Sequence, residues 1–241
     1  MTITCKNCNH NYKGHFCNNC GQSAETHEIN AHFLLHDIQH GILHFDKGIF
    51  YTLKQLFTRP GHTIREFIDG KRIRHFKPLT MILVLAAIYS FLFSFMGLSE
   101  KATFARETKS VVAIWVREHY SASQLLMLPL FSFASFLAFK KTAYNYFQHI
   151  ILNSYIIAQG LIINIVLLPV LYFDQNSEKS NYLTIIKLLG LLTMIVWTYF
   201  QFFKGFSATY KITHSLLSIF ISIIGIFLCA IIYATIRTYL I

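Results

Sequence analysis

The order of apolar and polar residues divides the chain into a polar N-terminal third and an apolar remainder. Long apolar runs follow residue 78, and they predict helices at 79–98, 121–139, 150–173, 182–203 and 213–236. Unlike the one-sided helices of a soluble core, these runs are apolar on every face. Each is close to the roughly 20 residues that cross the hydrocarbon of a bilayer. The pattern therefore predicts an all-α polytopic membrane protein with about five transmembrane helices.

A few polar residues interrupt these runs. Pro129 lies in the second run and Lys187 in the fourth. Gln159 and Asn164 lie in the third run, and Gln201 lies near the end of the fourth. Polar side chains inside spans form hydrogen bonds between helices, or they line the path of a solute. We favour the first interpretation and keep a channel or transporter as an alternative. Cys229, in the fifth run, is expected to be a small buried apolar residue.

Composition supports a division into three segments. Only 13% of all residues are charged, and the net charge is +10; residues 1–78 hold 10 of the 21 Lys and Arg residues and 9 of the 12 histidines. We assign residues 1–24 to a cysteine-containing module, 25–78 to an amphipathic, basic interfacial segment, and 79–241 to a transmembrane domain. The first residues lack the apolar stretch of a cleavable signal peptide.

Four cysteines near the N-terminus form two Cys-x-x-Cys pairs. Cys5 and Cys8 make the first pair, and Cys17 and Cys20 make the second. This ligand set and spacing predict a structural zinc ribbon with four thiolate ligands and no open position for catalysis. Disulfides, a redox pair and rubredoxin-like iron are the alternatives. Disulfides require export, and a thioredoxin-like pair requires a βαβ context that the sequence lacks.

Four histidines recur at intervals of four residues and form one stripe on a predicted helix: His32, His36, His40 and His44. The main interpretation is the polar stripe of an interfacial amphipathic helix. A second metal site and a pH sensor are alternatives, because imidazole binds metals and titrates near neutral pH. A further amphipathic segment follows, so we expect helices at the membrane surface.

Basic residues set the expected orientation. The segment before the first span ends in a cluster of five, Arg65, Lys71, Arg72, Arg74 and Lys77. Cytosolic segments of membrane proteins are enriched in Lys and Arg, so the pattern predicts a cytosolic N-terminus and an external C-terminus. The cluster is expected to contact anionic headgroups or a partner protein. Nucleic acid is an alternative partner, although no specific motif supports it. An amphipathic surface helix is expected within 99–120.

These motifs together resemble an uncharacterised bacterial family. They are the cysteine pairs ending in Cys-Gly-Gln, Arg59-Pro60-Gly61, the run 64–72, Lys77-Pro78-Leu79-Thr80 and the aromatic run 144–149. The resemblance implies a zinc ribbon joined to several spans of the inner membrane, and it implies no established activity. More loosely, the chain resembles transmembrane accessory proteins of RNA-targeting CRISPR systems. That likeness implies a role in antiviral defence.

The sequence favours a non-enzymatic role. The zinc ribbon and basic segment are expected to recruit or regulate a cytosolic protein at the bacterial inner membrane. A channel or transporter-like protein, including a modulator of CRISPR defence, is the first alternative. A membrane-bound enzyme that uses the His-rich helix is the second, although no paired acid and base or nucleophile motif is present. The sequence leaves oligomeric state open.

Overall fold

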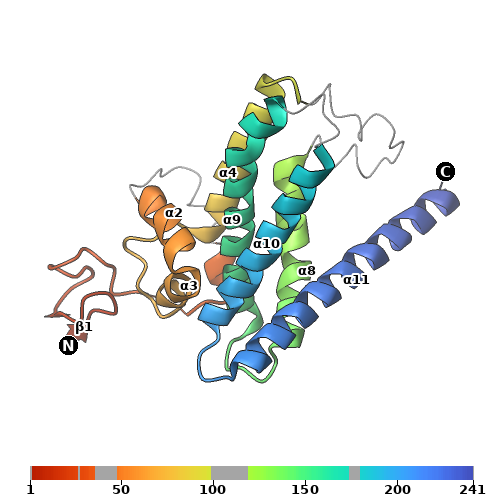
Figure 1. Cartoon of the computed structure of the whole chain (residues 1–241). Coiled ribbons are helices and arrows are strands. Elements are labelled where there is room, and N and C mark those ends of the chain that lie inside the picture. The colour runs from red at the N-terminus through yellow and green to blue at the C-terminus, as the bar shows by residue number, and fades with distance from the viewer. Residues whose placement is uncertain (1, 27, 36–47, 99–118, 174–179, 241) are drawn as a thin grey trace.

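The computed structural model describes residues 2–26, 28–35, 48–98, 119–173 and 180–240. Five long helices form a bundle (Figure 1): α4 (Pro78–Phe95), α8 (Tyr120–Ala138), α9 (Tyr146–Phe173), α10 (Ser180–Phe202) and α11 (Ala208–Leu240). All five are long and apolar enough to cross a bilayer. The prediction of a mainly helical chain with five candidate membrane spans is therefore confirmed by the length and composition of these helices.

Helix α9 lies at the centre of the bundle and packs against α4 and α8 over much of its length. Its side chains Ile151, Leu152, Tyr155, Ala158 and Leu161 are buried. Helix α11 packs against α8 and α10 and is largely exposed (Figure 1). Exposed apolar side chains on a span match a lipid environment, in which helices need no apolar partner.

The observed helices differ from the predicted runs mainly at their ends. Helix α9 begins at Tyr146 rather than at 150, and α11 extends over Ala208–Leu240 rather than 213–236. Most of the additional residues are polar, charged or aromatic, so hydropathy alone placed these ends outside the spans. Cys229 was expected to be buried, and this prediction is wrong, because its side chain is exposed on α11.

Two shorter helices, α2 (Gly48–Thr58) and α3 (Pro60–Ile68), precede the bundle. Each buries one face in the same apolar core as the long helices, through Ile49 and Leu56 of α2 and Ile64 and Phe67 of α3. The side-chain amide of Gln159 in α9 donates to the carbonyl of Leu56 at 2.7 Å. The short helices are thus integral to the helical core.

The motif Arg59-Pro60-Gly61 brings α3 against the end of α10. Pro60 occupies the first turn of α3. No helical hydrogen bond is lost there, because the first N–H groups of a helix have no partner within it. A Cβ on Gly61 would overlap the backbone of Gln201 and Phe202, so only glycine permits this approach. The side chain of Gln201 was predicted to form a hydrogen bond between helices or to line a solute path. Here its backbone carbonyl accepts a hydrogen bond from the guanidinium of Arg65.

The N-terminal module is a small separate unit. Strands β1 (Ile3–Thr4) and β2 (Asn11–Tyr12) pair antiparallel, with Ile3 opposite Tyr12. Its own small core contains Cys5, Tyr12 and Cys17. Helix residues 31–35 follow the module, and Phe33 packs edge-to-face on Phe67.

Part of the predicted surface structure lies outside the described residues. His36, His40 and His44 belong to that part, as do residues 99–118 of the predicted surface helix. His32 is described, and it is exposed in the helical segment 31–35. The second metal site and the pH sensor therefore stay predictions.

Candidate metal centre

The module consists of two knuckles with the same backbone structure. In the first (residues 5–10), Cys5 N–H donates to His10 O at 2.9 Å, and Asn9 N–H donates to Cys5 O at 2.9 Å. In the second (residues 17–22), Cys17 N–H donates to Gln22 O at 2.9 Å, and Gly21 N–H donates to Cys17 O at 2.7 Å. The fifth residue of each knuckle has positive φ, 58° at Asn9 and 77° at Gly21. Asn and Gly are the residues that adopt this conformation most readily.

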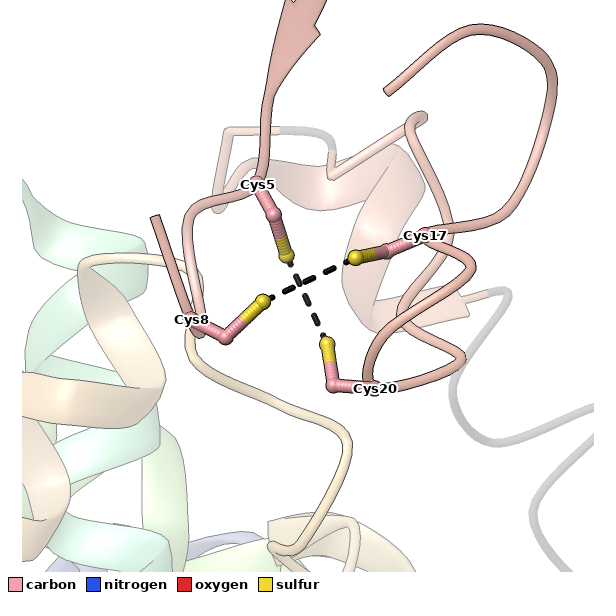
Figure 2. Close-up of side chains that lie close together, drawn as sticks. All are labelled: Cys5, Cys8, Cys17 and Cys20. Atoms are coloured by element: carbon pink, nitrogen blue, oxygen red, sulfur yellow. Dashed lines mark hydrogen bonds between the residues drawn. The ribbon is translucent and has the colours of Figure 1, made fainter. Parts of the chain in front are cut away.

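The two knuckles bring four sulfur atoms to one point (Figure 2). All four Sγ atoms lie within 4.8 Å of one another, with Cys5 Sγ 3.5 Å from Cys20 Sγ and Cys8 Sγ 3.6 Å from Cys17 Sγ. A tetrahedral ion with metal–sulfur bonds of about 2.3 Å separates its sulfur ligands by about 3.8 Å. A disulfide requires about 2.05 Å, and all four cysteines are free. The arrangement fits four thiolate ligands of one metal ion.

Hydrogen bonds from both knuckles favour the thiolate form of Cys8 and Cys20. The side-chain amide of Asn19 donates to Cys8 Sγ and, together with the N–H of His10, lowers the pKa of the Cys8 thiol to about 6. The N–H of Gln22 lowers the pKa of Cys20, with a further contribution from the side chain of Asn7. Metal ligation requires thiolates, so these donors favour the form that binds a metal.

Burial acts in the opposite direction at Cys5. Removal of this side chain from water raises the pKa of its thiol to about 11, against weaker opposing effects of the N–H groups of Cys8 and Asn7. A buried thiolate without a counter-charge is unfavourable, and a divalent cation at the centre would supply that charge. The donor set and its surroundings therefore fit a metal ion.

The second knuckle is attached to the helical core through Gln22. This side chain is buried, and its amide donates to Gly70 O at 2.8 Å. Its oxygen accepts from the N–H of Arg72 at 3.0 Å and from the N–H of Ile73 at 3.3 Å. One side chain thereby satisfies three backbone groups of the loop that joins α3 to α4.

Gly70 permits the module to approach this loop. Its φ is +98°, and an added Cβ would lie 2.8 Å from Lys6 Cδ and 3.0 Å from Thr26 Cγ2. The ammonium of Lys6 also donates to Thr26 O at 3.2 Å. The segment Asp69-Gly70-Lys71-Arg72 is therefore the surface on which the metal module rests.

The five basic residues predicted to contact headgroups or a partner lie in different environments. Lys71 and Arg74 are exposed, and Lys77 is half-buried. The Arg72 guanidinium lies 4.4 Å above the centre of the Phe33 ring, and its Nε donates to Phe67 O. Lys71 and Arg74 are therefore the members of this cluster whose side chains are most accessible to headgroups or a partner protein.

Arg65 differs from the other four basic residues, and its predicted role in contacting headgroups or a partner is corrected. Its guanidinium is buried and donates to the carbonyls of Gln201 and Phe202 at the C-terminal end of α10. The last carbonyls of a helix have no partners within the helix and carry partial negative charge, which a cation stabilises. Arg65 therefore caps α10 and lacks an exposed guanidinium.

Sequence reasoning identified the four cysteines and missed the residues that support them. The sequence pattern assigned no role to Asn7 or Asn19, and Gln22 entered only as the last residue of the Cys-Gly-Gln motif. An alignment of the two pairs within the chain places Asn7 opposite Asn19 and His10 opposite Gln22. That internal correspondence is the signal that could have identified the asparagines.

Comparison with known proteins adds one partial match. A family model described as a protein of unknown function (DUF3667) matches residues 46–90, which include α2, α3, the loop under the module and most of α4. The match covers the motifs from Arg59 to Thr80 and excludes the cysteine pairs. No curated protein and no solved structure matches the chain.

Proposed function

We propose that the chain is a bacterial inner-membrane protein whose zinc module recruits a cytosolic partner protein to the membrane. In this arrangement the N-terminus is cytosolic, and five spans place the C-terminus outside. The Lys and Arg distribution supports that orientation. Zn²⁺ is the proposed metal because four thiolates in a closed tetrahedral site are its typical structural ligands. The reducing cytosol keeps such thiolates free of disulfides.

The observation that carries this proposal is the attachment of the module by Gln22. Three hydrogen bonds join the second knuckle to the α3–α4 loop, beside the exposed side chains of Lys71 and Arg74. A metal module that only stabilised its own fold would need no such attachment. A module held in one position next to a basic loop presents a preorganised surface, which lowers the entropic cost of binding.

The exposed chemistry indicates the kind of partner. The loop between the cysteine pairs exposes Lys13, His15 and Phe16, and Phe16 is 66% exposed. Aromatic side chains surrounded by polar and cationic groups are typical anchors of protein interfaces. The proposed partner is therefore a protein with an acidic surface that includes an apolar pocket.

The experiment uses the full chain in native membranes. A 1–78 fragment would expose Leu56, Ile64 and Phe67, which are buried in the helical core, and would bind proteins nonspecifically. A photo-crosslinking amino acid replaces Phe16, and the same residue replaces Phe95, an exposed position at the far end of α4, as the control. We expect a discrete protein adduct from position 16 and none from position 95.

Two sets of substitutions test whether that adduct depends on the proposed surface. Cys5→Ser/Cys8→Ser removes metal ligands, and Lys71→Glu/Arg74→Glu reverses the exposed charge. Each double variant is expected to reduce the adduct at least fivefold. An adduct that survives both, or an adduct with RNA instead of protein, would overturn the proposal.

A further inference from the structure

The helical bundle contains a cavity of about 310 Å³ between α8, α9, α10 and α11. Eight polar side chains line it, among a larger number of apolar ones: Tyr120, Gln124, Asn153, Gln159, Asn164, Tyr199, Ser218 and Ser222. Within the part of the chain that the structure describes, no charged side chain lines it. Apolar cavities of this size with a few convergent polar groups are typical of small-molecule sites.

Three of these polar side chains, Asn153, Gln159 and Tyr199, form hydrogen bonds between helices. Tyr199 donates from its hydroxyl to Asn153 Oδ1 at 2.8 Å, and Asn153 donates to Ser135 Oγ at 2.8 Å. The side-chain amide of Gln159 donates to Leu56 O, and its side-chain oxygen accepts from the hydroxyl of Thr198 at 3.2 Å. These groups hold the helices together, as the first interpretation of the polar residues predicted for Gln159.

Asn164 is different. Its Nδ2 lies 3.4 Å from the hydroxyl of Tyr120, whereas its Oδ1 is buried and has no hydrogen-bond partner. A buried carbonyl oxygen without a hydrogen-bond donor is unfavourable. Among the described residues that line the cavity, this oxygen is the only buried side-chain polar atom without a partner. A molecule in the cavity that donates one hydrogen bond would satisfy it.

The cavity also adjoins the apolar exterior of the bundle. Ile223 and Ile226 of α11 line it and are 59% and 43% exposed, respectively. Both lie in a candidate span, so their exposed faces would contact acyl chains. Access to the cavity along α11 is therefore from the hydrocarbon of the membrane.

From these observations we infer that the cavity binds an uncharged amphiphile from the bilayer, a lipid alcohol whose hydroxyl donates to Asn164 Oδ1. The uncharged lining excludes an ionic head group, because an unpaired charge at this depth is strongly unfavourable. The apolar lining accommodates part of the chain, and the remainder extends past Ile223 and Ile226 into the lipid.

The test uses the full-length protein in phosphatidylcholine nanodiscs. The probe is hexadecanol that carries a diazirine and a terminal alkyne, and the matching carboxylate and trimethylammonium compounds are the charged controls. We expect the alcohol to label peptides of α9 and α11 in a manner that saturates and that unlabelled hexadecanol competes. Equal labelling by all three probes, or labelling that does not saturate, would overturn the inference.

A pair of glycines supplies matched variants. A Cβ on Gly160 would lie 3.5 Å from Leu191 Cδ2, so a leucine there must extend into the cavity that Gly160 lines. A Cβ on Gly190 meets nothing within 4 Å. Gly160→Leu is expected to reduce the saturable labelling at least fivefold, and Gly190→Leu is expected to leave it unchanged. Labelling of Gly160→Leu at the wild-type level would contradict the proposed site.

Asn164→Leu provides a second test that preserves the volume of the side chain. It removes the acceptor, and we expect the half-saturating concentration of the alcohol to rise about tenfold. A wild-type value in this variant would show that the hydroxyl does not bond Asn164. This variant keeps the inference testable if Gly160→Leu fails to give monodisperse protein.

Discussion

The two knuckles of the metal module share one backbone structure and differ in their surroundings. Cys5 and Cys17 are buried at equivalent positions, and Cys8 and Cys20 are partly buried. At the last position, however, His10 is exposed, whereas Gln22 is buried against the α3–α4 loop. The comparison separates two tasks. The cysteines common to both knuckles could bind a metal ion, and Gln22, at one of the three positions where the knuckles differ, attaches the module to the helical core.

The largest expected effect comes from residues that the knuckles share. Cys8→Ser and Cys20→Ser should each abolish stoichiometric metal binding, because each removes one of the four thiolates that the tetrahedral site requires. The measurement is metal content by mass spectrometry of purified full-length protein. Cys229→Ser, at an exposed position of α11, is the control and should retain one metal ion per chain. Unequal losses at Cys8 and Cys20 would contradict the equivalence of the knuckles.

The second prediction concerns the last position of the knuckles, His10 in the first and Gln22 in the second. Gln22→Ala removes three hydrogen bonds to Gly70, Arg72 and Ile73, a loss of about 3 kcal/mol at roughly 1 kcal/mol per bond. Backbone N–H groups of Arg72 and Ile73 should then exchange hydrogen at least tenfold faster, while metal content stays unchanged. His10→Ala is the matched control and should alter neither quantity. Faster exchange in His10→Ala would show that the first knuckle contributes equally to the attachment.

This difference also marks the limit of what the sequence predicts. The five apolar runs and the two cysteine pairs are local patterns, and each fixes its own structure within a few residues. Gln22 and Arg65 act over long separations, since Gln22 bonds Gly70 and Arg65 bonds Gln201 and Phe202. Nothing near either residue identifies its partner. The positive charge of Arg65 was read as part of a basic surface because the end of α10 lies far away in the chain.

A smaller effect is expected from the paired asparagines. Asn7→Ala and Asn19→Ala each remove a side-chain donor to a cysteine of the opposite knuckle. Loss of such an outer-shell hydrogen bond typically weakens metal affinity 10–100-fold, and we expect about tenfold for each variant. Competition with a chromophoric chelator measures this affinity. Asn18→Ala changes an exposed residue of the same turn and should leave the affinity unchanged; an equal loss there would assign the effect to the turn.

The smallest expected effect concerns Asn9 and Gly21, the residues of positive φ in the first and second knuckles. Gly21→Ala places a Cβ in the left-handed region at a cost of about 1 kcal/mol, because no neighbouring atom lies within 4 Å to add a clash. Asn9→Gly should change metal affinity by less than twofold, since Asn already tolerates this conformation. We expect Gly21→Ala to weaken the affinity about fivefold in the same chelator competition. If both substitutions were neutral, Asn9 and Gly21 would not determine the backbone conformation of the knuckles. The correspondence between the two knuckle sequences would then not explain their shared structure at this position.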